Sequence, residues 1–444
     1  MNLVSVNAGA RLDRLPISAF HRRILTLIAI GMFFDGYDVY VAATVLGATL
    51  KSGFSTLAQN AQFVSATFVG MMIGSFLTGF LGDRYGRRFT YQANLIIFGL
   101  ASIASAFAPT MTILILLRGV MGVGLGAELV AGYSAMAEFL PPQARGRWCG
   151  ILNAVVVASV PISSLASTLL IPRFGWRTMF VIGGVGALVA WYMRKAMPES
   201  PRWLESVGRY EEAEKMLREI EREVAALHPT LPEPTPPPPA ALDRSFSVLF
   251  RPGLFSRLFV GCICLIVANT LIYGFVTWLP TFFVQQGLSM ANSFRYSFLM
   301  SIGAPVGAAI GASTADYVGR KLAIISASML AIVFGGIYPF VRDPILLSVT
   351  GFLLVVCIYI LVALLFAIYI PELFPTAVRM RAVGLCNTLG RMATIFTPFL
   401  VVFLFRSYGV GGVVSLMIGL LVVQILAVHF YGIEPKMRSL EEMH

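Results

Sequence analysis

Long apolar runs occupy most of this chain and alternate with short polar connections. Each run is about 20 residues or longer, the length that an α-helix needs to cross roughly 30 Å of hydrocarbon. We identify twelve, at 22–50, 61–82, 89–108, 111–139, 147–171, 176–195, 257–286, 292–316, 321–341, 344–371, 381–407 and 409–432. The runs lack the strict alternation of a membrane β-barrel. The pattern therefore predicts an all-α integral membrane protein with twelve transmembrane helices.

Two polar phrases between the runs occur once in each half of the chain. Asp-Arg-Tyr-Gly-Arg-Arg at 83–88 is followed 233 positions later by Asp-Tyr-Val-Gly-Arg-Lys at 316–321. Glu-Phe-Leu-Pro at 138–141 matches Glu-Leu-Phe-Pro at 372–375 at an offset of 234, and two arginines follow each copy. This duplication predicts two pseudo-symmetric six-helix halves with a site between them, as in many secondary transporters.

The two halves, residues 1–195 and 257–444, are separated by one long polar stretch at 196–256. It contains Pro-Glu-Ser-Pro-Arg-Trp-Leu at 198–204, a charged helix expected near 208–227 and a proline tract at 236–239. Mixed charges four residues apart are typical of a solvated helix, and proline runs favour an extended, solvated backbone. We expect a linker, with a partner-binding helix as the alternative.

Basic residues gather on one side of the predicted spans. The chain is 57% hydrophobic and 12% charged, with a net charge of +11 that by itself could indicate a nucleic-acid partner. Its distribution instead follows the positive-inside pattern. The residues on this side are Arg11, Arg14, Arg22, Arg23, Arg84, Arg87, Arg88, Arg145, Arg147, Arg320, Lys321, Arg379 and Arg381. We expect a multi-pass membrane protein with both termini and the linker in the cytosol and no nucleic-acid partner.

The sequence lacks the residues that would indicate an enzyme, a metal site or a nucleotide-driven pump. No Gly-Lys dipeptide of a phosphate loop occurs, and the four histidines are scattered. The five cysteines lie within predicted spans, where a disulfide framework or a zinc site is not expected. We therefore expect no metal and no cofactor, and an ion gradient as the driving force.

A small set of ionisable residues lies deep within the predicted spans, where charge is expensive and marks a functional pathway by default. They are Asp35 and Asp38 in the first span, Arg118 and Glu128 in the fourth, and Arg391 in the eleventh. The repeat does not preserve them: Asn269 stands opposite Asp35, Phe352 opposite Arg118 and Val157 opposite Arg391. Because the scaffold is duplicated and the charges are not, we interpret the charges as functional.

The acidic pair is three residues apart and so lies on one side of a helix. Desolvation and mutual repulsion both favour the protonated form, so we expect Asp35 and Asp38 to exchange a proton as a unit, with Arg118 as counter-ion. The alternative is a permanent buried ion pair between the first and fourth helices. Glu128 follows a run of small residues and is either a second proton site or a helix–helix hydrogen bond.

Arg391 lies ten residues after Arg381, about 15 Å along a helix and therefore near the midplane. An unpaired guanidinium there would attract an anion, and its planar fork matches a carboxylate. The alternative is a hidden ion pair with Asp35, Asp38 or Glu128. Aromatic and amide side chains would complete the site, although any single aromatic is more often packing. The substrate-binding set is Arg391, Tyr37, Trp278, Tyr273, Asn269, Asn387 and Phe282.

The duplicated phrases have the composition of gates. An aspartate near one helix end and arginines across a short turn can hold the cytosolic face closed and then release it. The gating set is Asp83, Arg84, Arg87, Arg88, Asp316, Arg320, Glu138, Arg147, Glu372 and Arg381.

Together, the duplicated phrase at 83–88, the 198–204 phrase and Pro-Glu-Leu-Phe-Pro-Thr at 371–376 resemble the major facilitator superfamily over nearly the whole chain. Asp-Gly-Tyr-Asp at 35–38 resembles the first-helix signature of the aromatic acid/proton symporters. Gly-Leu-Gly-Ala-Glu-Leu at 124–129 and Tyr-Gly-Phe-Val-Thr-Trp at 273–278 are closer to the bacterial niacin permeases (NiaP) and the related synaptic vesicle glycoprotein 2 group. The seventh-helix glutamine pair of the sugar porters is missing, so a sugar is not the expected substrate.

This resemblance implies alternating access, by rocking of residues 1–195 against 257–444 around a midplane site. Niacin, a flat ring with one carboxylate, fits the residues: Arg391 would hold the carboxylate while Tyr37 and Trp278 flank the ring. The implied function is proton-coupled uptake of niacin by a monomer in the bacterial cytoplasmic (inner) membrane. A symporter for benzoate or hydroxybenzoate-type acids is the first alternative. A transporter-like receptor without net transport is a second, of a different class.

Overall fold

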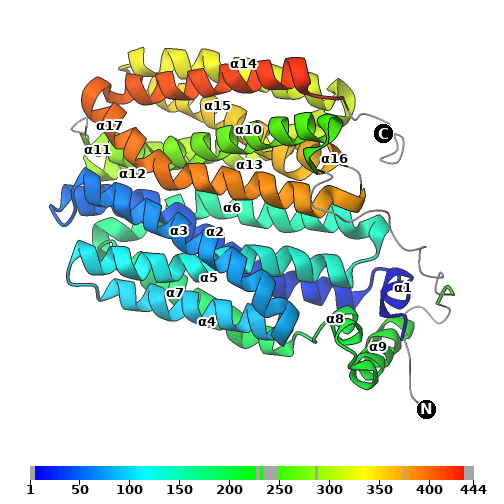
Figure 1. Ribbon diagram of the computed structural model, residues 1–444. Helices are drawn as coiled ribbons and strands as arrows, with labels where there is room; N and C mark the ends of the chain where they lie inside the picture. The colour runs from blue at the N-terminus through cyan, green and yellow to red at the C-terminus, as the bar shows by residue number, and fades with distance from the viewer. Residues whose placement is uncertain (1–5, 227–230, 234–248, 286–288, 375, 435–444) are drawn as a thin grey trace.

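The computed structural model describes residues 6–226, 231–233, 249–285, 289–374 and 376–434, and within these ranges the predicted all-α class is confirmed (Figure 1). The N-terminal half contains α2 (Ala19–Lys51), α3 (Leu57–Tyr85), α4 (Arg87–Ala106), α5 (Met111–Phe139), α6 (Pro142–Phe174) and α7 (Arg177–Met193), followed by η1 (Arg194–Ala196). The C-terminal half contains α10 (Pro252–Gly274), η3 (Val276–Trp278), α11 (Leu279–Gln285), α12 (Met290–Ser301), α13 (Gly303–Val318), α14 (Arg320–Ile337), η4 (Tyr338–Phe340), α15 (Pro344–Val362), the π-helix η5 (Ala363–Tyr369), α16 (Ile370–Glu372) and α17 (Thr376–Tyr431). In Figure 1 the N-terminal half forms the lower layer and the C-terminal half the upper one.

Helices occupy each of the twelve predicted spans. By length and composition, nine stretches of the described chain are apolar enough to cross a membrane, and one of them, Ala382–Tyr431, covers two predicted spans. α17 bends within that stretch at Gly409, whose φ of 63° and ψ of −157° are not helical. The two predicted spans outside these nine stretches are also helical. The shorter α7 forms the span at 176–195, and α12 with α13 forms the span at 292–316.

Proline interrupts two of the spans. In the seventh, α10 gives way to η3 and α11; Pro280 has no N–H to donate to the carbonyl of Val276, one turn earlier. In the eighth, α12 ends at Ser301 and α13 begins at Gly303, where Pro305 cannot donate to Ser301. Both interruptions lie in segments that contact the N-terminal half, since η3 and α11 meet α2 and α12 meets α6.

The duplicated phrases make matching interactions at the arginine-rich end, which we call the cytosolic end after its charge pattern. Arg87 Nε donates to Glu138 at 2.9 Å, and Arg320 Nε donates to Glu372 at 3.0 Å. Both α4 and α14 begin directly after a glycine with positive φ, 97° at Gly86 and 94° at Gly319, a conformation that favours glycine. The predicted duplication is therefore visible in the contacts as well as in the sequence.

A carboxylate also caps the first turn of each of these two helices. Glu199 accepts hydrogen bonds from the backbone N–H groups of Arg87 and Arg88. Glu434 accepts them from Arg320 and Lys321 at 3.0 and 2.9 Å. A negative group is favourable at a helix N-terminus, where the first N–H groups have no intrahelical partner.

The remaining members of the predicted gating set divide into two groups. Arg88 donates from Nη2 to the carbonyl of Lys195 at 2.9 Å, and Arg84 lies over the ring of Tyr85 at 5.4 Å. The other side chains lie outside the described residues, and they are Asp83, Arg147, Asp316 and Arg381.

The linker packs a helix onto the N-terminal segment at the cytosolic end (Figure 1). The predicted charged helix is confirmed as α9 (Tyr210–Ala225), preceded by α8 (Pro201–Ser206). Its surface is not solvated all round, as the charge pattern suggested, because Leu217, Ile220 and their neighbours are buried against α1 (Ala8–Asp13). Arg11 of α1 pairs with Glu214 and Glu221 of α9 at 2.5 and 2.6 Å. The proline tract at 236–239 lies outside the described residues.

The halves touch through helix ends opposite the cytosolic end and through the middle of the molecule. α11 and α12 lie at the end of the molecule away from α8 and α9 (Figure 1). Ser65 of α3 donates to the carbonyl of Ile395 in α17 at 2.5 Å, and a Cβ on Gly47 of α2 would lie 3.3 Å from Pro280. The structure therefore holds the two halves together on the outer side.

Small residues allow α5 to approach its neighbours inside the N-terminal half. A Cβ on Gly122 would lie 3.1 Å from the Cα of Gly70 in α3. A Cβ on Gly124 would lie 2.8 Å from both the carbonyl oxygen of Asn94 and the Cβ of Phe98 in α4. The glycine run therefore lets α5 pack closely against both neighbours, and this packing fixes where α5 presents its charged side chains.

Gly124→Val should destabilise the protein by about 1–3 kcal/mol, because the added atoms meet backbone and Cβ atoms that cannot move aside. The measurement is thermal unfolding of the purified protein in detergent. Gly150→Val is the matched control, since a Cβ on Gly150 would meet nothing within 4 Å. Equal melting temperatures for the two variants would contradict this packing.

Candidate functional site

The first buried charge pair joins α2 to α5. Arg118 forms an ion pair with Asp38, and each side chain is only 1% exposed. Arg118 also donates from Nε to Thr67 Oγ1 at 2.9 Å and from Nη2 to the carbonyl of Asp38 at 3.3 Å, and it lies over the ring of Phe63. The guanidinium is thus satisfied on several sides, and Arg118 is the counter-ion of Asp38.

The second buried pair joins α5 to η1. Glu128 forms an ion pair with Arg194, again with both side chains 1% exposed. Arg194 also donates from Nε to the carbonyl of Leu27 at 2.8 Å and from Nη2 to that of Ile28 at 2.7 Å. Glu128 therefore links two segments through a charge pair rather than through a neutral hydrogen bond.

Arg194 was not expected from the sequence. It lies at the end of an apolar run, where an arginine usually faces water, and nothing in the local pattern indicates that it turns inward. A signal lies far away in the sequence at Gly31 of α2, because a Cβ there would lie 2.7 Å from Arg194 Cζ and 3.1 Å from Glu128 Oε1. A glycine in the middle of an apolar helix can thus mark the place where a buried charge pair lies.

Asp35 is the third buried carboxylate among the described residues of the N-terminal half. It is 3% exposed, and among the described residues neither of its carboxylate oxygens has a hydrogen-bond partner. It follows Gly31 by one helical turn, so it faces the same side as the pair of Glu128 with Arg194 and interacts electrostatically with both. Three carboxylates therefore share two guanidinium groups.

Arg391 of α17 lies in the C-terminal half, and no counter-charge accompanies it among the described residues. Within the described part of the chain, no carboxylate lies within ion-pair distance of its guanidinium, which makes no side-chain hydrogen bond there. Unlike Arg118 and Arg194, it is partly exposed. The hidden ion pair with Asp35, Asp38 or Glu128 is wrong, because Asp38 and Glu128 pair with other arginines and Asp35 faces one of those pairs.

Amide side chains lie next to Arg391 on two helices. Asn387 precedes it by one turn of α17 and so shares its side of the helix; its Nδ2 donates to the carbonyl of Val383 at 2.9 Å. Asn269 of α10 packs against Gly390, where a Cβ would lie 2.8 Å from its Nδ2. The structure therefore brings both predicted asparagines to the arginine.

Aromatic side chains from both halves meet beside this group. Tyr273 of α10 is close enough to Arg391 to interact electrostatically, and its ring centroid lies 4.5 Å from that of Phe68 in α3. Tyr40 of α2 and Tyr359 of α15 bring their hydroxyl oxygens within 3.1 Å across the interface. Tyr359 was not expected, because a tyrosine in a run of aliphatic residues is usually packing.

The other predicted aromatics have different surroundings. Tyr37 lies between α2 and α7, with its hydroxyl 3.5 Å from the sulfur of Met179. Phe282 stacks on Phe405 of α17 with a centroid distance of 4.7 Å, and Trp278 stacks on Phe282 at 6.4 Å. Tyr37 belongs to the interior of the N-terminal half, and the other two to an aromatic stack near the outer end.

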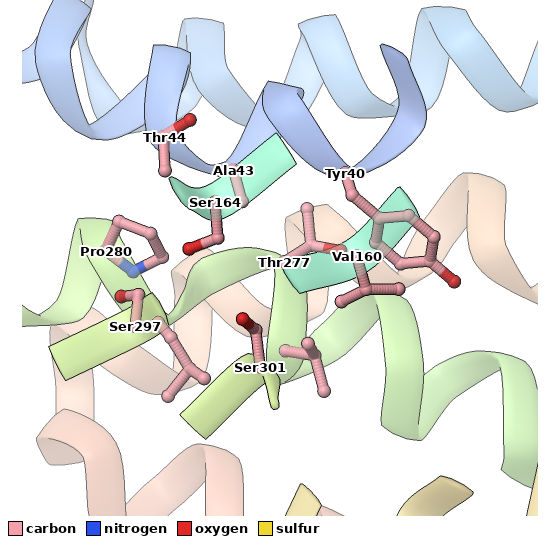
Figure 2. Close-up of a pocket in the computed structure, with 11 residues that line it drawn as sticks. Tyr40, Ala43, Thr44, Val160, Ser164, Thr277, Pro280, Ser297 and Ser301 are labelled. Carbon is pink, nitrogen blue, oxygen red and sulfur yellow. The ribbon is translucent and has the colours of Figure 1, made fainter. Parts of the chain in front are cut away.

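A small cavity separates the halves on the outer side of Tyr40 (Figure 2). Its volume is about 30 Å³. Figure 2 shows Thr44 and Ser164 of the N-terminal half opposite Thr277, Ser297 and Ser301 of the C-terminal half. A space of this size holds a few waters, whereas an aromatic ring needs on the order of 150 Å³. This cavity is therefore too small for an aromatic substrate in this structure.

The fold consists of two helical halves, and its buried charged side chains include both ion pairs and residues without a partner among those described. These features are those of a membrane transporter of the major facilitator superfamily. Residues 24–444 match the sugar (and other) transporter family, and the chain belongs to that family, whose members are not enzymes.

The chain is similar to two bacterial transporters along its length. It is 36% identical to the inner membrane metabolite transport protein YdjE of Escherichia coli, with 98% of each chain covered. It is 31% identical to the niacin transporter NiaP of Acinetobacter baylyi, with 100% of each covered. Among solved structures it matches the xylose transporter XylE from E. coli in a partially occluded inward-open conformation, with a TM-score of 0.73 and 18% identity over 95% of this chain and all of the other. That likeness shows the fold.

Glu128→Ala should lower stability by about 3–5 kcal/mol, because it leaves the guanidinium of Arg194 buried without a counter-charge. Adding Arg194→Met should recover much of that loss. The measurement is thermal unfolding in detergent.

Glu212→Ala is the control for this pair. It removes an ion pair with Arg209 whose side chains are 49% and 56% exposed, and exposed pairs contribute about 0–1 kcal/mol. Equal decreases in melting temperature for Glu128→Ala and Glu212→Ala would contradict the claim that Glu128 and Arg194 form a buried ion pair.

Proposed function

We propose that this protein imports a small aromatic monocarboxylate together with a proton across the bacterial cytoplasmic membrane, and that the substrate is niacin (nicotinate). The observation that carries the proposal is Arg391, an arginine within the long apolar helix α17 that has no counter-charge among the described residues. An unpaired guanidinium in a site of low dielectric is costly, so a bound carboxylate would both satisfy it and be held by two parallel hydrogen bonds.

The surroundings of Arg391 suit a flat ring. Tyr273 and Phe68 already form an edge-to-face pair beside it, and Tyr40 and Tyr359 meet across the interface. Asn269 and Asn387 supply amide groups for a polar ring atom. We therefore assign the ring to Tyr273, Tyr40 and Tyr359, and leave Tyr37 out of the proposed site.

Niacin is favoured over other aromatic acids by the likeness to the niacin transporter of Acinetobacter baylyi. Proton coupling is supported by the three buried carboxylates Asp35, Asp38 and Glu128, which share the guanidinium groups of Arg118 and Arg194, since a carboxylate in excess of its counter-charges takes up a proton readily. The two halves would rock around this region, opening the contacts that now hold their outer sides together.

Arg391→Ala and Arg391→Lys should both weaken nicotinate binding by tenfold or more, because a lost charge-assisted pair costs about 1.5–3 kcal/mol and an ammonium group cannot reproduce the two-pronged contact. Isothermal titration calorimetry of the purified protein measures this. Arg406→Ala, an exposed arginine on the same helix, is the control. Unchanged affinity in Arg391→Ala would exclude Arg391 as the carboxylate site.

Three ligands and one flux measurement separate the candidate functions. Nicotinamide, which keeps the ring and loses the charge, should bind about tenfold more weakly than nicotinate. Benzoate keeps the carboxylate and lacks the ring nitrogen, so stronger binding of benzoate would favour the aromatic acid symporter. In proteoliposomes with the outside more acidic, labelled nicotinate should accumulate. Binding without accumulation would identify a receptor.

A further inference from the structure

The N-terminal half contains a carboxylate that its neighbours leave uncompensated. Asp35 lies at the midpoint of α2, a helix of 33 residues. Its carboxylate oxygens are buried and have no hydrogen-bond partner among the described residues. Asp38, three residues further on, has Arg118 as its own partner.

The elements packed around Asp35 present few other charges. From its own helix it faces Asp38, from α5 it faces Glu128, and from η1 it faces Arg194. From α6, Ser159 lies against Gly36, and its hydroxyl donates to the carbonyl of Val156 rather than to Asp35. Arg194 already pairs with Glu128 and donates to two backbone carbonyls of α2, and none of its hydrogen bonds within the described chain reaches Asp35.

A charge count follows from these contacts. Asp38 with Arg118 is neutral, Glu128 with Arg194 is neutral, and Asp35 adds one negative charge in a site that excludes water. Such a charge is far more costly than a neutral carboxylic acid. Proton binding at Asp35 removes the excess without breaking either ion pair, whereas proton binding at Asp38 or Glu128 would leave a buried arginine uncompensated.

We propose that Asp35 is the proton-binding group of the transport cycle, and that the Asp38–Arg118 and Glu128–Arg194 pairs remain ionised throughout. This inference rests on the proposed function, because it names the group that carries the coupled proton. The Asp35 carboxylate takes a proton from outside water when the halves open outward and returns it to cytosolic water when they open inward. Gly31 is part of the site, because only a glycine leaves room for the pair that faces Asp35.

Infrared difference spectroscopy of the purified protein tests the assignment without requiring transport. A protonated buried carboxylic acid has a C=O stretching band that an ionised carboxylate lacks. The wild-type protein should show one such band that titrates as the pH is raised. Asp35→Asn, which keeps the size of the side chain and removes the titrating group, should abolish it.

The double variant Asp38→Asn/Arg118→Gln is the matched comparison, because it removes a pair whose charges cancel. It should retain the titrating band. A band that survives in Asp35→Asn would overturn the assignment. If that surviving band disappears in the double variant, the proton belongs to Asp38 instead. Should the double variant fail to fold, the Asp35→Asn spectrum alone still decides.

Transport separates failure of this inference from failure of the proposed function. In Asp35→Asn, accumulation driven by a pH gradient should vanish while exchange of internal for external nicotinate continues. If Asp35→Asn still accumulates nicotinate under the gradient, the inference fails and proton-coupled uptake stands. If the wild type shows the titrating band but no accumulation, the proposed function fails and the assignment of the proton to Asp35 stands.

Discussion

An ionised side chain in a hydrocarbon interior needs a counter-charge, and the arrangement of buried charges in this protein follows from that need. Two ion pairs, Asp38 with Arg118 and Glu128 with Arg194, meet the requirement inside the N-terminal half. The glycines of α5 and the glycine at position 31 allow the helices and the arginine to approach closely enough for the pairs to form. Among the described residues of the membrane-spanning helices, the carboxylate of Asp35 and the guanidinium of Arg391 remain outside these pairs.

These two unmatched charges account for coupling in simple terms. A proton would neutralise the excess in the N-terminal half, and a carboxylate would neutralise the excess in the C-terminal half. With both bound, each half is locally compensated, so rocking no longer moves an isolated charge through a closed interface. With only one bound, one half still carries an unmatched charge in low dielectric. The hydroxyls of Tyr40 and Tyr359 meet between the halves. This contact lies at the interface whose closing would depend on whether both charges are neutralised.

Much of the fold could be predicted from the sequence, because membrane helices follow from apolar length and the duplication follows from repeated polar phrases. Asp38, Arg118 and Arg391 were identified for the same reason: a charge inside an apolar run is conspicuous. Arg194 was not, because it lies at the end of a run and only the fold turns it inward. The positions of Tyr37 and Tyr359 depend on how each helix is rotated against its neighbours, and a run that is apolar on every side does not specify that rotation.

The central claim is that one proton accompanies each carboxylate, and the equilibrium between their two gradients tests it most directly. In proteoliposomes held at zero membrane potential, the nicotinate gradient at equilibrium should rise about tenfold for each unit of pH difference, since both correspond to about 1.4 kcal/mol. A membrane potential imposed without a pH difference should produce no accumulation, because a proton and a monovalent anion together carry no net charge. Accumulation that is independent of the pH difference, or that a membrane potential alone can drive, would contradict the account.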